Sequence, residues 1–208
     1  MDLNLFIKGL MLGFSIAAPV GPIGVLCIRR TLSEGRISGL ASGLGAATAD
    51  GFYGLVAGFG LTIISDLLIE KKTWLALIGG IYLCYMGIQT FRSKPKEFGK
   101  DVENKGLWSA YFSTFLLTLA NPVTILSFVA IFAGLGLVSN TGSYTSAFSL
   151  VAGVFLGSGV WWLTLSGGVS LLRERFNSQT LVWVNRLAGV ILGIYGILAL
   201  ITAFKGST

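Results

Sequence analysis

The sequence predicts an all-α integral membrane protein in which six transmembrane helices form two inverted three-helix repeats, with broken first and fourth helices. Three observations lead to this prediction: a strongly hydrophobic composition, six long apolar segments, and a similarity between the two halves of the chain. Of the 208 residues, 53% are hydrophobic and 12% are charged, whereas about 25% of the residues of a soluble domain are charged. The composition therefore favours the lipid bilayer as the environment of most of this chain.

Six apolar segments, separated by charged or polar clusters, take up nearly the whole chain. A helix needs roughly 20 apolar residues to cross a bilayer. The segments cover residues 3–28, 37–65, 74–91, 108–138, 144–172 and 181–204. We therefore expect six transmembrane helices and no separate soluble domain.

The two halves of the chain resemble each other. An offset of 109 residues aligns Tyr53 with Trp162, and an offset of 103 residues aligns Pro19 with Pro122. The difference between the two offsets falls in the connection between the first and second segments of each half. This order of aligned residues indicates a duplicated three-helix unit.

The duplication and the positive charges predict how the chain is organised in the membrane. We predict a first three-helix repeat at residues 1–93, a cytoplasmic linker at 94–106 and a second repeat at 107–208. Three spans per repeat require the two halves to insert with opposite orientation. Ten of the 15 Lys and Arg residues follow the first, third and fifth segments. Because the side richer in Lys and Arg is usually cytoplasmic, both termini should be periplasmic or extracellular.

Prolines interrupt the first and fourth segments. Proline has no N–H and breaks the hydrogen-bond ladder of a helix, so each of these segments should consist of two half-helices. The first N–H groups of the second half-helix and its positive dipole end would face the break and suit an anion. On this interpretation the substrate-binding candidates are Pro19, Gly21, Pro22, Ile23, Gly24, Asn121 and Pro122. The alternative is that the prolines only kink helices that neighbours repair.

Asp50 is the acidic residue that lies deep within an apolar segment. It is 13 positions into the second segment, about 20 Å along a helix. A carboxylate at this depth is costly and usually marks an ion, proton or substrate pathway. It shares an i, i+4 stripe with the small residues Ala46, Gly54 and Gly58, so we expect it to face the bundle. Asp50 would exchange protons or hold a substrate ammonium, or else be a protonated carboxyl hydrogen-bonded to backbone at a packing interface.

Other features exclude several classes of protein. The chain has no histidine, and its two cysteines, Cys27 and Cys84, lie in different apolar segments. These residues form no recognisable metal or disulfide motif, so we expect neither a metal nor a cofactor. We also expect no enzyme, because no nucleophile and base stand out, and no nucleic-acid partner, because orientation in the membrane explains the net charge of +6. Tyr53 and Trp162 would line a cavity at equivalent places in the repeats, unless they serve only packing.

The sequence resembles the lysine exporter superfamily (LysE/RhtB type) over nearly its whole length. The motifs that carry the resemblance are Pro19-Val20-Gly21-Pro22, the basic turn at residues 32–39, Asp50 in a glycine-rich segment, the third-segment pattern at 74–87, and Asn121-Pro122. The resemblance implies a bacterial inner-membrane exporter of amino acids or their derivatives, driven by the proton gradient and often a homodimer.

The sequence as a whole therefore predicts a secondary transporter that exports amino acids or similar small zwitterionic solutes across the inner membrane by proton antiport. The substrate carboxylate would bind at the half-helix starts, and its ammonium or an exchanging proton would bind at Asp50. Two alternatives stay open at this point. One is an inorganic cation (metal) exporter, and the other is a membrane scaffold or partner-binding protein that transports nothing.

Overall fold

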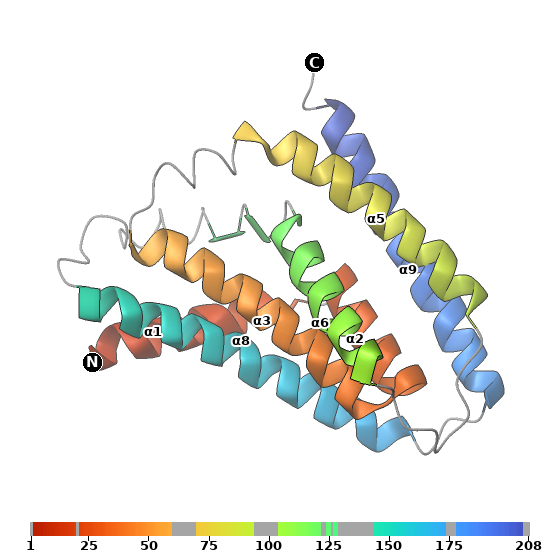
Figure 1. Ribbon diagram of the computed structural model, residues 1–208, viewed down its shortest axis with the longest axis horizontal. Helices are drawn as coiled ribbons and strands as arrows, with labels where there is room; N and C mark the ends of the chain where they lie inside the picture. Colours follow the sequence, from red (N-terminus) through yellow and green to blue (C-terminus); the bar gives the residue numbers. More distant parts are fainter. Residues whose placement is uncertain are drawn as a thin grey trace.

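The computed structural model of this chain describes residues 2–19, 21–59, 70–93, 104–121, 124–125, 127–128, 144–173 and 178–205. These residues contain seven helices and no strand (Figure 1). The helices are α1 (Leu3–Ala17), α2 (Pro22–Glu34), α3 (Arg36–Gly58), α5 (Lys72–Arg92), α6 (Asn104–Leu119), α8 (Tyr144–Arg173) and α9 (Ser178–Lys205). The predicted all-α architecture is confirmed for this part of the chain.

Several of these helices can cross a membrane. By length and hydropathy, α5, α8 and α9 can each span a bilayer, and α1 and α2 together form a further candidate as one bent span. Helix α6 is apolar but shorter. Helix α3 has 23 residues but is rich in Gly, Ala and Ser, which lower its hydropathy, and it contacts α1, α2, α6 and α8. The protein is a multi-pass membrane protein, and the total of six spans stays a prediction.

The predicted break in the first segment is confirmed. Helix α1 ends at Ala17, and its last hydrogen bond runs from the Ala18 N–H to the Phe14 carbonyl at 2.9 Å. Helix α2 then begins at Pro22, a position where the missing N–H of proline costs a helix nothing. The two helix axes are bent by 78°. Pro19 therefore lies between the half-helices, whereas Pro22 opens the second one.

The fourth segment also leaves its helix near the predicted proline. Helix α6 ends at Leu119, and the Asn121 N–H donates to the Thr118 carbonyl at 3.2 Å. Residues 124–125 and 127–128 are again helical, and the Ile125 N–H donates to the Asn121 carbonyl at 3.1 Å. Pro122, which we predict to break this segment, lies outside the described residues.

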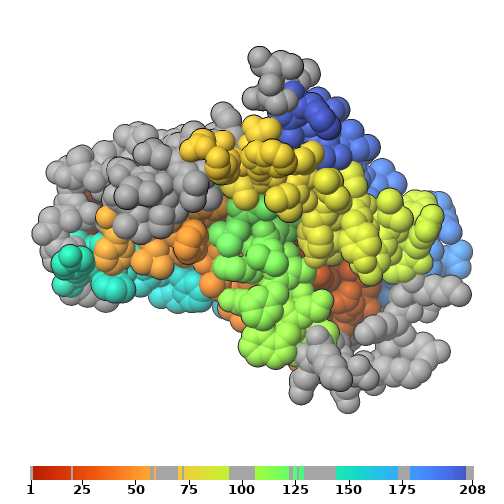
Figure 2. Space-filling view, turned by 45° about the horizontal axis from the view of Figure 1, so that its top comes forward, coloured from red at the N-terminus to blue at the C-terminus, as the bar shows by residue number. Residues whose placement is uncertain are grey.

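The helices form two groups with α2 and α6 between them (Figure 1). Helices α5 and α9 lie side by side as one pair, and α1, α3 and α8 form the other group. In the space-filling view, the green α6 separates the orange α3 from the yellow α5 (Figure 2). The half-helix α2 contacts α3 and α8 on one side and α9 on the other, so the region where α1 and α2 meet lies between the groups.

Glycines set the spacing between α5 and α9. A Cβ atom at Gly80 would lie 3.0 Å from the Gly196 carbonyl oxygen, and one at Gly87 would lie 2.8 Å from the Gly189 carbonyl oxygen. These distances are too short for a side chain, so the two backbones are in direct contact. The two contacts also exchange with each other under the 109-residue offset, because Gly80 aligns with Gly189 and Gly87 with Gly196.

Glycines also bring α1 and α8 together. A Cβ atom at Gly9 or Gly13 would overlap the backbone of α8, and one at Gly153 or Gly157 would overlap the backbone of α1. This close approach fixes the end of α1, and with it the position of the break, against the long helix α8.

We expect Gly157→Ala to destabilise the protein by about 1–3 kcal/mol, since the added methyl group would overpack the contact with Leu10. The control is Gly168→Ala on the same helix, where a Cβ atom would meet nothing within 4 Å and alanine is the better helix former. Thermal unfolding in detergent measures both variants. Equal stability of the two variants would contradict the packing described here.

Candidate functional site

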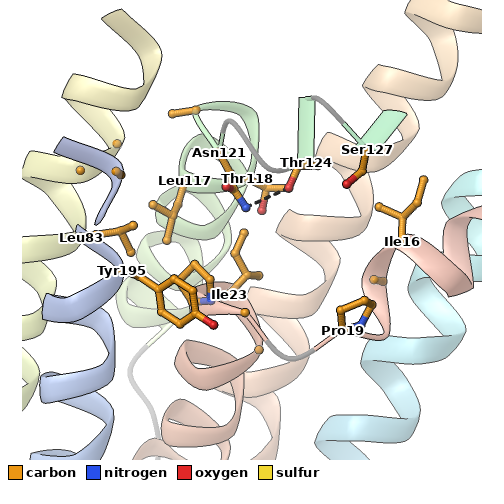
Figure 3. A pocket seen from close by; sticks show the side chains of 18 of the residues that line it. Ile16, Pro19, Ile23, Leu83, Leu117, Thr118, Asn121, Thr124, Ser127 and Tyr195 are labelled. Carbon is orange, nitrogen blue, oxygen red and sulfur yellow. Dashed lines mark hydrogen bonds between the residues drawn. The ribbon is translucent and has the colours of Figure 1, made fainter. Parts of the chain in front are cut away.

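A cavity of about 510 Å³ lies where the first and fourth segments leave their helices (Figure 3). Small-molecule sites typically enclose about 300–1,000 Å³, so its size suits a solute of a few heavy atoms. The wall contains Ile16, Ala17, Pro19, Gly21, Pro22, Ile23, Gly24, Asp50, Gly79, Gly80, Leu83, Leu117, Thr118, Ala120, Asn121, Thr124, Ser127, Trp162, Tyr195, Leu198, Ala199 and Thr202.

Most of the residues predicted as site candidates line this one cavity. They come from the α1–α2 break, from the end of α6, from the middle of α3 and from α8. Two candidates do not belong to this group: Tyr53 is absent from the cavity wall, and Pro122 lies outside the described residues. The candidates that line the cavity are Pro19, Gly21, Pro22, Ile23, Gly24, Asp50, Asn121 and Trp162.

The start of α2 presents backbone donors at the cavity. Gly21 is its N-cap residue, has an extended backbone and supplies no side-chain cap. The first hydrogen bond of the helix ladder runs from the Val25 N–H to the Gly21 carbonyl at 3.0 Å. The N–H groups of Ile23 and Gly24 precede that bond, and both residues line the cavity. A helix start of this kind attracts anions such as carboxylates.

The end of α6 forms the wall across from Ile23 and Pro19 in Figure 3. The Asn121 amide donates to the Thr124 hydroxyl oxygen at 2.9 Å, which is the dashed line in that figure. Ser127 also lines the cavity here. This wall thus adds the Asn121 amide and the hydroxyl groups of Thr118, Thr124 and Ser127 to a cavity whose remaining wall is mostly apolar.

Tyr53 lies behind this wall. Its hydroxyl group donates to the Leu119 carbonyl oxygen at 2.7 Å, at the position where α6 ends and carbonyl groups lose their helical partners. The ring also stacks on Phe128, with 5.1 Å between the centroids. Tyr53 is therefore tied by its hydroxyl group to the end of α6, and it is absent from the cavity wall.

Asp50 is 3% exposed and lines the cavity. Its Oδ2 atom accepts a hydrogen bond of 2.6 Å from the Ser158 hydroxyl. Its hydrogen-bond partner among the described residues is thus a side chain of α8. Among the described residues that line the cavity, Asp50 is the only acidic or basic side chain. The cavity therefore combines one carboxyl group with the positive end of α2, a pairing that suits a molecule carrying both charges.

Arg30 is a buried residue that sequence reasoning missed. It is one of the ten Lys and Arg residues that we assign from the sequence to the connections after the first, third and fifth segments, but it lies inside α2 and is 6% exposed. Its Nη1 atom donates to Ser42 Oγ at 2.8 Å, to the Ala110 carbonyl at 2.9 Å and to Thr114 Oγ1 at 2.8 Å, and its Nη2 atom donates to Ser113 Oγ at 2.8 Å. Arg30 thereby ties α2 to α3 and α6. The sequence did contain a signal for a buried cation here, because the hydroxyl residues that accept its hydrogen bonds lie at equivalent depth in the second and fourth apolar segments.

The neighbouring charges form a separate cluster. Arg29 pairs with Glu34 at 3.0 Å, and its Nε atom donates to the Asn185 side-chain oxygen at 3.4 Å. That oxygen also accepts from the Ser33 hydroxyl at 2.7 Å. Glu34 is therefore engaged with Arg29, and the four hydrogen bonds of Arg30 go to neutral oxygens. Within the described residues, no three His, Cys, Asp or Glu side chains lie close enough together to hold a metal ion.

The chain is similar to known proteins over most of its length. Residues 14–203 match the family described as LysE type translocator. A Bacillus subtilis (strain 168) protein, provisionally named amino acid efflux protein YcgF, is 30% identical over 200 residues, which are 93% of this chain and 94% of that protein. The threonine efflux protein of Escherichia coli (strain K12) is 26% identical over 205 residues, which are 94% of this chain and 97% of that protein. No solved structure matches the chain.

We expect Arg30→Gln to lower the free energy of unfolding by about 1–3 kcal/mol, because buried acceptors on α3 and α6 would lose their donor. Arg36→Gln is the matched control, since Arg36 is exposed at the start of α3. Both variants can be compared by unfolding in mixed detergent micelles. A control variant that loses as much stability as Arg30→Gln would contradict the structural role of Arg30.

Proposed function

This chain belongs to the LysE type translocator family, and we propose from that premise that it is a secondary transporter that exports amino acids or similar small zwitterionic solutes by proton antiport. A translocator moves its solute across the membrane without converting it. The observation that carries the proposal is the cavity, which has the start of α2 in one wall and the Asp50 carboxyl in another.

The chemistry of the cavity supports a zwitterionic substrate. A carboxylate would accept hydrogen bonds from the N–H groups of Ile23 and Gly24 and gain from the dipole of α2. An ammonium group would pair with the Asp50 carboxylate. The amide of Asn121 and the hydroxyl of Ser127 line the remaining polar wall. The names of two relatives, an amino acid efflux protein and a threonine efflux protein, support the same class of solute.

Proton coupling follows from the same carboxyl group. One Asp50 carboxyl cannot hold a proton and pair with a substrate ammonium at the same time, so the two ligands compete for it. Competition for one site that faces each side of the membrane in turn produces exchange, in which the proton enters as the solute leaves. When no substrate is bound, a protonated Asp50 would also be uncharged, so the empty transporter could change orientation without the cost of an unpaired charge inside the membrane.

The proposed motion is a rocking of two inverted halves, residues 1–93 and 107–208, around the cavity. The packing supports this proposal, because the glycine contacts between α5 and α9 exchange under the repeat offset. The proposed repeat also makes α1 equivalent to α6 and α3 equivalent to α8, so the contact of α1 with α8 corresponds to the contact of α6 with α3. The distribution of Lys and Arg supports an inner-membrane orientation in which the linker at 94–106 is cytoplasmic and both termini lie on the other side.

In proteoliposomes tested with a panel of radiolabelled amino acids, we expect at least one to accumulate in response to an imposed pH gradient. Asp50→Asn should reduce this gradient-driven transport at least about tenfold, which corresponds to about 1.4 kcal/mol, because the amide cannot exchange a proton.

Asp2→Asn is the control for this experiment. It makes the same chemical change at the start of α1, where Asp2 caps the helix and asparagine caps equally well. Gradient-driven transport that is undiminished in Asp50→Asn would contradict the role of this carboxyl group.

A further inference from the structure

Two hydrogen bonds in series link Asp50 on α3 to two side chains of α8. The Trp162 Nε1–H donates to Ser158 Oγ at 3.0 Å, and the Ser158 hydroxyl donates to Asp50 Oδ2 at 2.6 Å. All three residues are buried: Asp50 is 3% exposed, Ser158 0% and Trp162 5%. The series joins the two proposed repeats at the cavity wall.

The chemistry of the three side chains determines which group donates in each of these two hydrogen bonds. An indole nitrogen can only donate, so Ser158 Oγ must accept the hydrogen bond from Trp162. The hydroxyl has a single proton, and that proton is directed to Asp50. Two other hydroxyls on α8 instead bond to the carbonyl four residues earlier, as is common in helices: Ser149 donates to Thr145, and Thr164 donates to Val160.

The position of Trp162 follows from the neighbouring helix. A Cβ atom at Gly43 on α3 would lie 2.5 Å from the Trp162 Cβ atom and 3.1 Å from its Cγ atom. The glycine therefore lets the indole approach α3 closely. With the indole held there, its N–H reaches Ser158 on the same helix, one turn away.

The two oxygens of Asp50 thus have different roles. Because Oδ2 accepts a proton donated by Ser158, a proton carried by the carboxyl group itself belongs on Oδ1. The bond to Ser158 is the hydrogen bond that the Asp50 side chain makes among the described residues, and the residue lines the cavity. Oδ1 is therefore the oxygen left for a ligand.

We propose that Ser158 is a positioning residue that holds Asp50 Oδ2, with its own proton directed by Trp162, so that Oδ1 is the atom that exchanges a proton or a substrate ammonium with the cavity. This inference rests on the proposed transport function. It assigns to α8 a direct part in setting the geometry of the α3 carboxyl group.

Infrared spectroscopy of the purified protein tests the hydrogen bond without relying on transport. The bands that disappear in Asp50→Asn identify the Asp50 carboxyl group. We expect Ser158→Ala to shift these bands, Ser158→Thr to leave them near their wild-type position, and Thr164→Val to leave them unchanged. Thr164→Val removes a hydroxyl group from the same helix at an exposed site. Unshifted bands in Ser158→Ala would overturn the proposal even if the protein transports amino acids.

Transport kinetics test the consequence for the substrate. We expect Ser158→Ala to raise KM by about tenfold to a hundredfold, the range for losing one hydrogen bond to a charged group, and Ser158→Thr to restore a low KM. Trp162→Phe keeps an aromatic ring in the cavity wall but removes the donor that directs Ser158, and it should raise KM less. A uniform loss of maximal rate with an unchanged KM in all three variants would contradict positioning and indicate a packing role. Shifted infrared bands in a protein that transports no amino acid would instead count against the proposed function alone.

Discussion

A backbone group that loses its hydrogen-bond partner inside a bilayer has no water to replace that partner, and the centre of this protein is built around that constraint. Pro22 starts α2 without an N–H, and Gly21 caps it without a side chain, so donors remain available where the chain turns by 78°. At the end of α6, the Tyr53 hydroxyl donates a hydrogen bond to the Leu119 carbonyl. Because such groups must be kept away from lipid, the breaks lie inside the bundle, and the cavity lies between them.

Close helix packing makes room for the polar groups that this interior contains. Glycines bring α1 against α8 and α5 against α9 at backbone distance, and the small-residue helix α3 packs among α1, α2, α6 and α8. Two ionisable side chains, whose burial is costly, form hydrogen bonds with neutral partners. Asp50 accepts one from Ser158, and Arg30 donates to three hydroxyl groups and a carbonyl group. Each of these sets of hydrogen bonds crosses from the first half of the chain to the second.

The sequence predicts features whose cause is local, and it misses those that depend on helix register. The break at Pro19 and Pro22 is predictable because a proline without an N–H acts at its own position. Asp50 stands out because a carboxyl group is rare in an apolar segment. Ser158 gives no such signal, since serine is ordinary in a membrane helix and only the packing of α8 on α3 brings it to Asp50. The repeat offset likewise aligns Tyr53 with Trp162, yet one holds the end of α6 and the other directs Ser158.

If one cavity faces the two sides of the membrane in turn, a residue in its wall should be accessible to a thiol reagent from each side. In a background without Cys27 and Cys84, Ser127→Cys places a single thiol in the cavity wall. A membrane-impermeant maleimide is then added to right-side-out and to inside-out vesicles. Alternating access predicts labelling from both faces, slowed in each case by the transported amino acid. Labelling from one face only, unaffected by that amino acid, would contradict it.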